Sequence, residues 1–204
     1  MQTWRNSNVI KIPNGEYCFF GIKTYFKKLD LKALCPNNII KLRVNIDGLP
    51  LCKSTSAQFW PILGLIVTSH KIPPFAIACY YGSSKPVCIQ QFLKDFINEV
   101  NELISNGYKQ DFQFNLAHFN CDAPARAFIK CIKNHNSYYG CEKCLQKRTV
   151  IDGHVKFLKI ESPLRTDDLF FSHFQEQHHT TKTPLFENQT LFRSFIFKLQ
   201  TNFN

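Results

Sequence analysis

Two aspartates occupy positions where a strand could present a carboxylate to a metal ion. Asp47 ends the alternating segment 41–47 and lies in its polar phase, whereas Asp122 falls between a second alternating segment, 112–121, and a helical pattern that begins at Ala123. Two ionised carboxylates side by side repel each other, and a divalent cation between them turns this repulsion into a binding site. The chemistry of such a pair is phosphoryl transfer, in which metal ions activate a hydroxyl group and stabilise the leaving oxygen.

Both aspartates also have structural interpretations, which the sequence leaves open. Asp47-Gly48 is a dipeptide typical of hairpin turns. Asp122 is well placed to cap the N-terminus of the following helix, which has Pro124 in its first turn.

A CxxC motif lies in a glycine-preceded loop. Cys141 and Cys144 have the spacing of one half of a tetrahedral zinc site, and because no second CxxC occurs, the other ligands must be histidines or a distant cysteine. A redox function of the thioredoxin type would need a strand before the motif and a helix after it, and neither is indicated. The sequence therefore favours zinc, with the histidine candidates in order of preference being His178 and His179, then His173, His154 and His135.

Composition indicates one compact domain, or one domain with a small appendage. The 204 residues are 44% hydrophobic and 20% charged, enough for a sizeable core. No apolar run approaches the length of a membrane span, which excludes a transmembrane protein, and the N-terminus shows no secretory signal. We therefore expect the nine cysteines to be mostly reduced thiols.

The formal net charge of +10 favours a polyanionic partner, nucleic acid first and an acidic membrane surface second. The basic residues are interleaved with apolar ones, a pattern that fits a basic folded surface better than a disordered arm. A basic protein without such a partner remains the simplest alternative.

The elements that must position these residues follow from periodicity. Residues 41–47, 59–68, 75–81 and 112–121 predict strands, the last with a slip in alternation at Ala117, and residues 89–104 and 123–133 predict helices, the first ending at Gly107. The order strand-strand-strand-helix-strand-helix predicts an α/β fold with a mixed sheet, because a crossover helix leads into a parallel strand. Farther along, residues 149–157 predict a hairpin turning on Asp152-Gly153, and residues 190–203 a short amphipathic helix.

The chain resembles transposase-derived proteins common in invertebrate genomes, which are similar to the CACTA (En/Spm-type) DNA transposases. The resemblance covers residues 14–186, and its most specific block is CDAPARAFIKCIKNHNSYYGCEKC. The motifs that support it are Asp47-Gly48, the segment from Ser56 to Trp60-Pro61, the helix end at Gly107, Asp122, and Cys141 with Cys144.

This resemblance implies an RNase H-like catalytic core acting on DNA in the nucleus. It implies that Asp47 and Asp122 are the first two carboxylates that bind Mg²⁺ or Mn²⁺. In the intact family the reaction is hydrolytic strand cleavage, followed by attack of the freed 3′-hydroxyl on target DNA. It also implies that Cys141, Cys144, His178 and His179 form a small zinc-binding insertion.

The expected organisation has three parts. Residues 1–133 would form a partial RNase H-like transposase core, residues 134–186 the zinc-binding insertion and residues 187–204 a divergent tail. The family places a third acid on a later helix, and Glu187 comes too early to serve, so we expect a C-terminally truncated fragment that is not catalytically competent alone.

Two other functions stay open at this stage. In the first, the chain is a non-enzymatic, transposon-derived module that binds DNA or a protein. In the second, it is a zinc-stabilised fold without a nucleic-acid role. A homo-oligomer is also among the alternatives.

Overall fold

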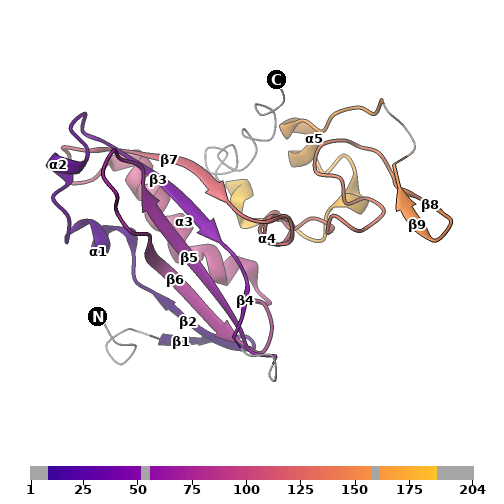
Figure 1. Cartoon of the computed structure of the whole chain (residues 1–204), viewed down its shortest axis with the longest axis horizontal. Coiled ribbons are helices and arrows are strands. Elements are labelled where there is room, and N and C mark those ends of the chain that lie inside the picture. The colour runs from indigo at the N-terminus through magenta and orange to yellow at the C-terminus, as the bar shows by residue number, and fades with distance from the viewer. Residues whose placement is uncertain (1–8, 52–55, 158–160, 188–204) are drawn as a thin grey trace. The chain divides into compact units, whose positions relative to one another are not determined.

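The computed structural model describes residues 9–51, 56–157 and 161–187, arranged as two compact units (Figure 1). The first unit is Met1–Asn120 and the second is Cys121–Asn204. The expected helix over residues 190–203 lies outside the described residues.

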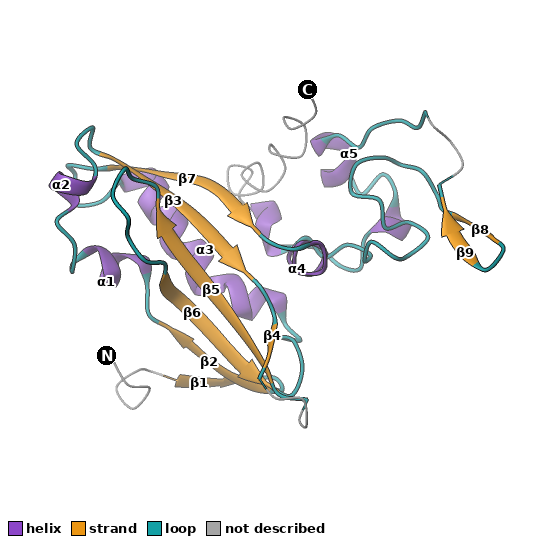
Figure 2. Ribbon diagram, in the orientation of Figure 1, coloured by secondary structure: helices purple, strands orange, loops and turns teal. Residues whose placement is uncertain are grey.

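The first unit is built on a seven-stranded mixed sheet (Figure 2). The strand order is β1-β2-β6-β5-β3-β7, with β4 paired to β5. Among these described strands the β3–β7 pair is parallel and the other pairs are antiparallel. The prediction of an α/β fold with a mixed sheet is confirmed. The strands are β1 (Val9–Ile12), β2 (Gly15–Phe19), β3 (Ile39–Ile46), β4 (Leu49–Pro50), β5 (Gln58–Ile66), β6 (Phe75–Gly82) and β7 (Gln113–Asn120).

The crossover between β6 and β7 is the long helix α3 (Ile89–Asn106), which packs on one face of the sheet. Its Phe92 ring makes edge-to-face contacts with Tyr17 of β2 and Tyr80 of β6, at centroid distances of 6.2 and 6.4 Å. Phe96 makes a similar contact with Phe119 of β7 at 6.0 Å. The apolar stripe predicted from periodicity therefore forms the core of this unit, and the helix ends at Gly107 with a φ of 68°, as expected.

The slip in alternation at Ala117 is a β-bulge. Leu42 of β3 is opposite Leu116 of β7, but the next residue, Arg43, is opposite His118, so Ala117 is the extra residue. A bulge leaves one residue unpaired and reverses the parity of those that follow. This explains why Phe119, and not His118, faces α3.

Two short helices precede β3: α1 (Ile22–Phe26) and α2 (Leu31–Leu34). The first turn of α1 has no side-chain cap of its own. Instead the Glu99 carboxylate of α3 accepts hydrogen bonds from the backbone N–H groups of Ile22 at 2.6 Å and Lys23 at 3.0 Å. A long-range contact thus supplies the acceptors that a local cap residue would otherwise provide.

The second unit is made of short elements joined by loops. It contains α4 (Ala123–Ile129), the hairpin of β8 (Thr149–Ile151) and β9 (His154–Lys156), α5 (Asp167–Phe171), and the 3₁₀ turns η2 (Glu176–His178) and η3 (Pro184–Glu187). The hairpin turns on Asp152 and Gly153, with φ values of 54° and 74°. These are the left-handed conformations that a two-residue turn requires, so this prediction is confirmed.

Helix α4 is shorter than the predicted segment 123–133. It ends at Ile129, and Cys131 adopts a φ of 54°. The N–H of Cys131 donates to the Phe128 carbonyl and that of Ile132 to the Ala127 carbonyl, which is the hydrogen-bond pattern of a Schellman motif. The predicted helix was too long because a cysteine takes the place where glycine usually marks such an end.

Candidate metal-binding sites

Asp47 interrupts a strand instead of turning a hairpin. Strands β3 and β4 both pair with β5, and β4 keeps the register of β3. Ile46 of β3 is opposite Ile62, and Leu49 of β4 is opposite Phe59. That register places Asp47 opposite Pro61, which has no N–H to donate to the ladder. The interpretation of Asp47-Gly48 as a hairpin turn is therefore wrong, and the interruption comes from a proline on the neighbouring strand.

The Asp47 carboxylate is held close to its own backbone. Its Oδ1 accepts a hydrogen bond from the Gly48 N–H at 2.7 Å. A Cβ on Gly48 would lie 2.5 Å from the indole ring of Trp60, so only glycine fits at this position. The Ser-x-x-x-Trp-Pro segment thus shapes the backbone beside Asp47 through both its tryptophan and its proline.

Asp122 caps α4, as the structural interpretation predicts. Its Oδ1 accepts a hydrogen bond from the Ala125 N–H at 2.7 Å, and Pro124 lies in the first turn. A cap occupies one carboxylate oxygen, and the residue is exposed to solvent. Capping and metal binding are therefore compatible for this side chain.

The two aspartates follow a pair of residues that are opposite each other in the sheet. Asn45 of β3 and Asn120 of β7 are partners in the parallel register, and the Asn45 side-chain amide donates to the Asn120 carbonyl at 2.6 Å. Asp47 and Asp122 each come two residues later in the sequence. Asp47 belongs to the first unit and Asp122 to the second, and a metal ion shared between them stays a prediction.

In the second unit, Cys141 and Cys144 lie close together. Their Sγ atoms are 3.3 Å apart, and the Cys144 N–H donates to the Cys141 Sγ at 3.4 Å. Two sulfurs bound to one tetrahedral zinc ion at about 2.3 Å each would be about 3.8 Å apart. The loop therefore holds the thiols near the separation that a shared zinc ion requires.

His178 has the burial and the tautomer that a metal-binding histidine needs. It is completely buried, and its Nδ1 lies 2.6 Å from the Tyr139 carbonyl oxygen. Because a carbonyl can only accept, Nδ1 carries the proton and Nε2 presents a lone pair. Nε2 is buried without a hydrogen-bond partner. Burial lowers the pKa of His178 to about 4, so the imidazole is neutral at pH 7, the form that binds metals.

His179 lies against His178 and is 8% exposed. The two imidazole rings are nearly perpendicular, at 88°, with centroids 5.3 Å apart. Among the described residues, neither nitrogen of His179 has a hydrogen-bond partner, and both are buried. Burial, and after it the neighbouring His173, His178 and Arg165 side chains, lowers the pKa of His179 to about 4.

His173 is less suited than His178 to bind the same metal ion as His179. Its ring stacks on that of His179 at 4.0 Å, with only 12° between the planes. A metal ion lies in the plane of each imidazole that binds it. Two stacked parallel rings cannot meet this condition for the same ion, whereas the perpendicular pair His178 and His179 can.

The cysteine pair and the histidine pair are not gathered into one cluster. Over the described ranges 9–51, 56–157 and 161–187, no group of three or more His, Cys, Asp or Glu side chains is close enough to hold an ion. The four-ligand zinc site, like the Mg²⁺ or Mn²⁺ site, therefore stays a prediction. Among the lower-ranked candidates, His135 is exposed.

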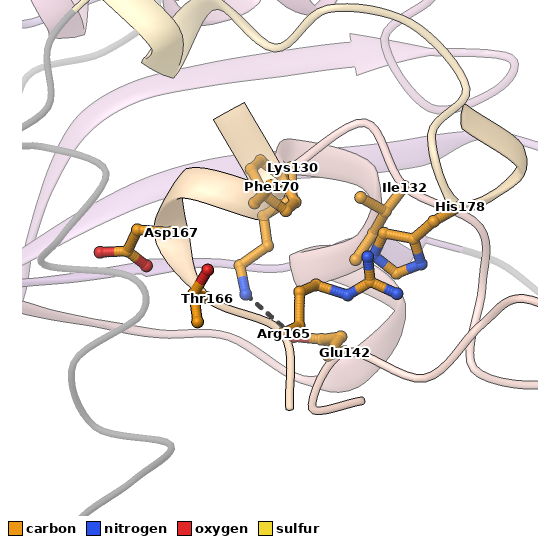
Figure 3. A pocket seen from close by; sticks show the side chains of 8 residues that line it. All are labelled: Lys130, Ile132, Glu142, Arg165, Thr166, Asp167, Phe170 and His178. Carbon is orange, nitrogen blue, oxygen red and sulfur yellow. Dashed lines mark hydrogen bonds and ion pairs between the residues drawn. The ribbon is translucent and has the colours of Figure 1, made fainter. Parts of the chain in front are cut away.

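Charged residues that sequence reasoning missed surround this region. The Lys130 ammonium group is 2.9 Å from Glu142 Oε2, and Arg126 contacts the same carboxylate at 3.4 Å. Lys130 and Glu142 line a small cavity of about 30 Å³ together with Arg165 and His178. Figure 3 shows the side chains around this cavity. In the sequence, the position of Glu142 between Cys141 and Cys144 was the feature that could have indicated these ion pairs.

Comparison with family models and with curated proteins finds no match to this sequence. Within the part of the chain that the structure describes, no helix has the length and apolar character needed to cross a membrane.

Proposed function

We propose that the first 133 residues form an RNase H-like core of DNA transposase type, in which Asp47 and Asp122 bind Mg²⁺ or Mn²⁺. The substrate would be DNA, and the reaction of the intact enzyme would be strand cleavage followed by strand transfer. The net charge of +10 is consistent with a polyanionic substrate.

The observation that supports this proposal best is the parallel register of β3 and β7. Asn45 and Asn120 are opposite each other, and each aspartate follows its asparagine by two residues. The ends of neighbouring parallel strands are where α/β sheets collect ligand-binding side chains. The order of β3, β5 and β6, then α3, then β7 beside β3 also agrees with the strand order implied by the resemblance.

Cation binding is a better test than catalytic turnover. The resemblance implies that catalysis needs a third acid, and no residue of this chain is assigned to that role. Asp47→Asn and Asp122→Asn are suitable variants. Asparagine can still accept the Gly48 and Ala125 hydrogen bonds, so local structure should survive while the charge is lost. The exposed loop residue Asp111 provides a matched control, Asp111→Asn.

We expect Mn²⁺ binding, followed by electron paramagnetic resonance or calorimetry, to be weakened in both variants and unchanged in Asp111→Asn. Nicking of supercoiled DNA, if present, should need Mg²⁺ or Mn²⁺ and both aspartates. Equal Mn²⁺ affinity in the wild-type protein and both aspartate variants would refute the shared site.

We further propose that Cys141, Cys144, His178 and His179 bind a structural zinc ion. The close thiols, the fixed tautomer of His178 and the perpendicular imidazoles support this ligand set over one containing His173. Co²⁺ titration tests it, because thiolate ligands give charge-transfer absorption in the near ultraviolet. We expect one equivalent of Co²⁺, displaced by Zn²⁺, and a loss of affinity in His178→Ala and His179→Ala but not in His135→Ala.

The second candidate function is DNA binding without catalysis. It is favoured by β3, where Lys41, Arg43 and Asn45 alternate with buried residues. Two exposed cations, Lys41 and Arg43, therefore lie on one face of the sheet. Salt-dependent binding of duplex DNA that persists in Asp47→Asn and Asp122→Asn, without nicking, would support this alternative. Replacing both Lys41 and Arg43 by alanine should then reduce the slope of log K against log salt by roughly two.

A further inference from the structure

Arg165 joins the two halves of the zinc-binding region. Its backbone belongs to a short pairing with the loop of the CxxC motif, in which the Arg165 N–H donates to the Lys143 carbonyl at 2.8 Å. The Leu145 N–H donates in turn to the Pro163 carbonyl at 3.0 Å, and Cys144 forms a bridge with Leu164. The start of the Arg165 side chain is therefore fixed against the cysteine loop.

The guanidinium group then connects this loop to the segment that leads into His178. Its Nη2 donates to the Cys144 carbonyl at 3.2 Å and to the Gln175 Oε1 at 2.6 Å, with a longer contact of 3.4 Å to the Cys141 carbonyl. The Gln175 amide closes the connection by donating to the Leu145 carbonyl at 3.0 Å. A planar fork of donors is suited to holding several acceptors in fixed directions.

Two further donors of Arg165 are not used. Its Nε and Nη1 atoms are buried and have no hydrogen-bond partner among the residues that the structure describes. The side chain lines the same cavity as the fully buried His178 (Figure 3). The electrostatics agree with a central position, because Arg165 interacts with both thiols and with both imidazoles. Burial lowers the pKa of Arg165, and the two cysteines oppose this shift.

We propose that Arg165 is a positioning residue for the metal site, and this inference rests on the zinc-binding function proposed above. It fixes the cysteine loop relative to the segment of His178 and His179, and it offers buried N–H groups to the thiolates that form when zinc displaces the thiol protons. Outer-shell groups of this kind typically change metal affinity by about 10–100-fold.

A contrary role for Arg165 has the opposite consequence. If its guanidinium instead takes the place of the metal ion between the ligand pairs, its removal would relieve competition between two cations and tighten metal binding. The sign of the change in affinity therefore separates the two roles.

The experiment measures Co²⁺ affinity and the visible cobalt spectrum for the wild-type protein, Arg165→Gln and Arg165→Lys. Lys156→Gln, which removes a positive charge from the exposed residue at the end of β9, is the control. We expect Arg165→Gln to weaken binding by about 10–100-fold and to alter the ligand-field bands. Arg165→Lys keeps the charge but not the fork and should recover only part of the affinity, whereas Lys156→Gln should match the wild type.

A metal-free measurement separates the possible failures. Hydrogen exchange at the Leu145 and Arg165 amides should be faster in Arg165→Gln, since the connection through Gln175 is lost. If the wild-type protein takes up no cobalt, the zinc site itself is refuted, and this role with it. If the wild type binds cobalt and Arg165→Gln binds it as tightly or more tightly, only the role of Arg165 is refuted.

Discussion

The ion pair between Lys130 and Glu142 gives the sharpest stability prediction for the second unit. The Lys130 side chain is 4% exposed and the Glu142 side chain 13%, and the ammonium nitrogen is 2.9 Å from Oε2. Removing one member of a buried pair leaves the other charge without compensation, which typically costs about 3–5 kcal/mol. Glu142→Gln keeps the shape of the side chain and removes only its charge, so we expect a loss near this range.

Amide hydrogen exchange of helix α4 is a suitable assay, because this helix leads directly into Lys130. A loss of about 3–5 kcal/mol in the free energy of opening corresponds to exchange that is about 10²–10⁴-fold faster. Lys130→Met in the Glu142→Gln background should recover much of the loss, since no buried charge is then left unpaired. Asp152→Asn, which removes a charge from the exposed turn of the β8–β9 hairpin, serves as the control.

The pH dependence checks the same reasoning. Burial alone would raise the pKa of Glu142, but the Lys130 and Arg126 charges outweigh it, and the net pKa is lowered. The stabilisation is therefore complete above the pKa of an unfolded glutamate, near 4.3, and is lost as the pH falls through the lower native pKa. If the free energy of unfolding of Glu142→Gln lay less than about 1 kcal/mol below that of the wild type, and its decrease at acid pH were the same as in the wild type, a buried ion pair would be refuted.

Three further changes test the first unit by chemical denaturation. Glu99→Ala leaves two N–H groups at the start of α1 without acceptors and should cost about 1–3 kcal/mol; a loss below 0.5 kcal/mol would contradict the capping role. Gly48→Ala should cost about 1–3 kcal/mol, because the new methyl group would lie 2.5 Å from the Trp60 ring, and Trp60→Leu should recover part of this loss. Burial raises the pKa of Cys79 to about 12, so the unfolded chain releases this proton first as the pH rises above about 9. Stability should then fall by up to about 1.4 kcal/mol per pH unit, and the same slope in Cys79→Ala would refute the assignment.

Much of the sheet could be predicted because its signals are local. The alternation of 41–47 marks β3, the stripe of 89–104 marks α3, and the slip at Ala117 marks the bulge in β7. In each case a period of 2 or 3.6 residues reports directly on which side chains are buried. The turn at Asp152-Gly153 belongs to the same class, because its left-handed conformations depend on the two residues themselves.

Local structure could not be predicted where a distant residue decides it, or where a cysteine takes the position usual for glycine. Asp47-Gly48 has the composition of a turn, but Pro61 on the next strand determines that the strand is only interrupted. Helix α1 takes its acceptors from Glu99, more than seventy residues away along the chain. Helix α4 is followed by Cys131 in a left-handed conformation, at a position where glycine would have indicated the helix end. None of these relations has a short-range pattern in the sequence.

The proposed zinc ligands illustrate the same division. The spacing of Cys141 and Cys144 predicts that their sulfurs are close, and they are 3.3 Å apart. The adjacent His178 and His179 gave no indication which ring nitrogen would be protonated, because the Tyr139 carbonyl that decides it lies 39 residues away. Arg165 had no signal at all, since its importance comes from three acceptors that meet only in the folded chain.

The two candidate sites differ in how their ligands are solvated, and this difference constrains what each could do. Asp47 is half-buried and Asp122 exposed, so a cation on either carboxylate would keep bound water and exchange with solvent, as the ions of phosphoryl-transfer sites do. His178 and His179 are buried with lone pairs that no protein donor satisfies. Buried polar atoms left in this state are costly, and a bound ion is one way to remove the cost. The first arrangement is suited to an exchangeable catalytic cation, and the second to a permanent structural one.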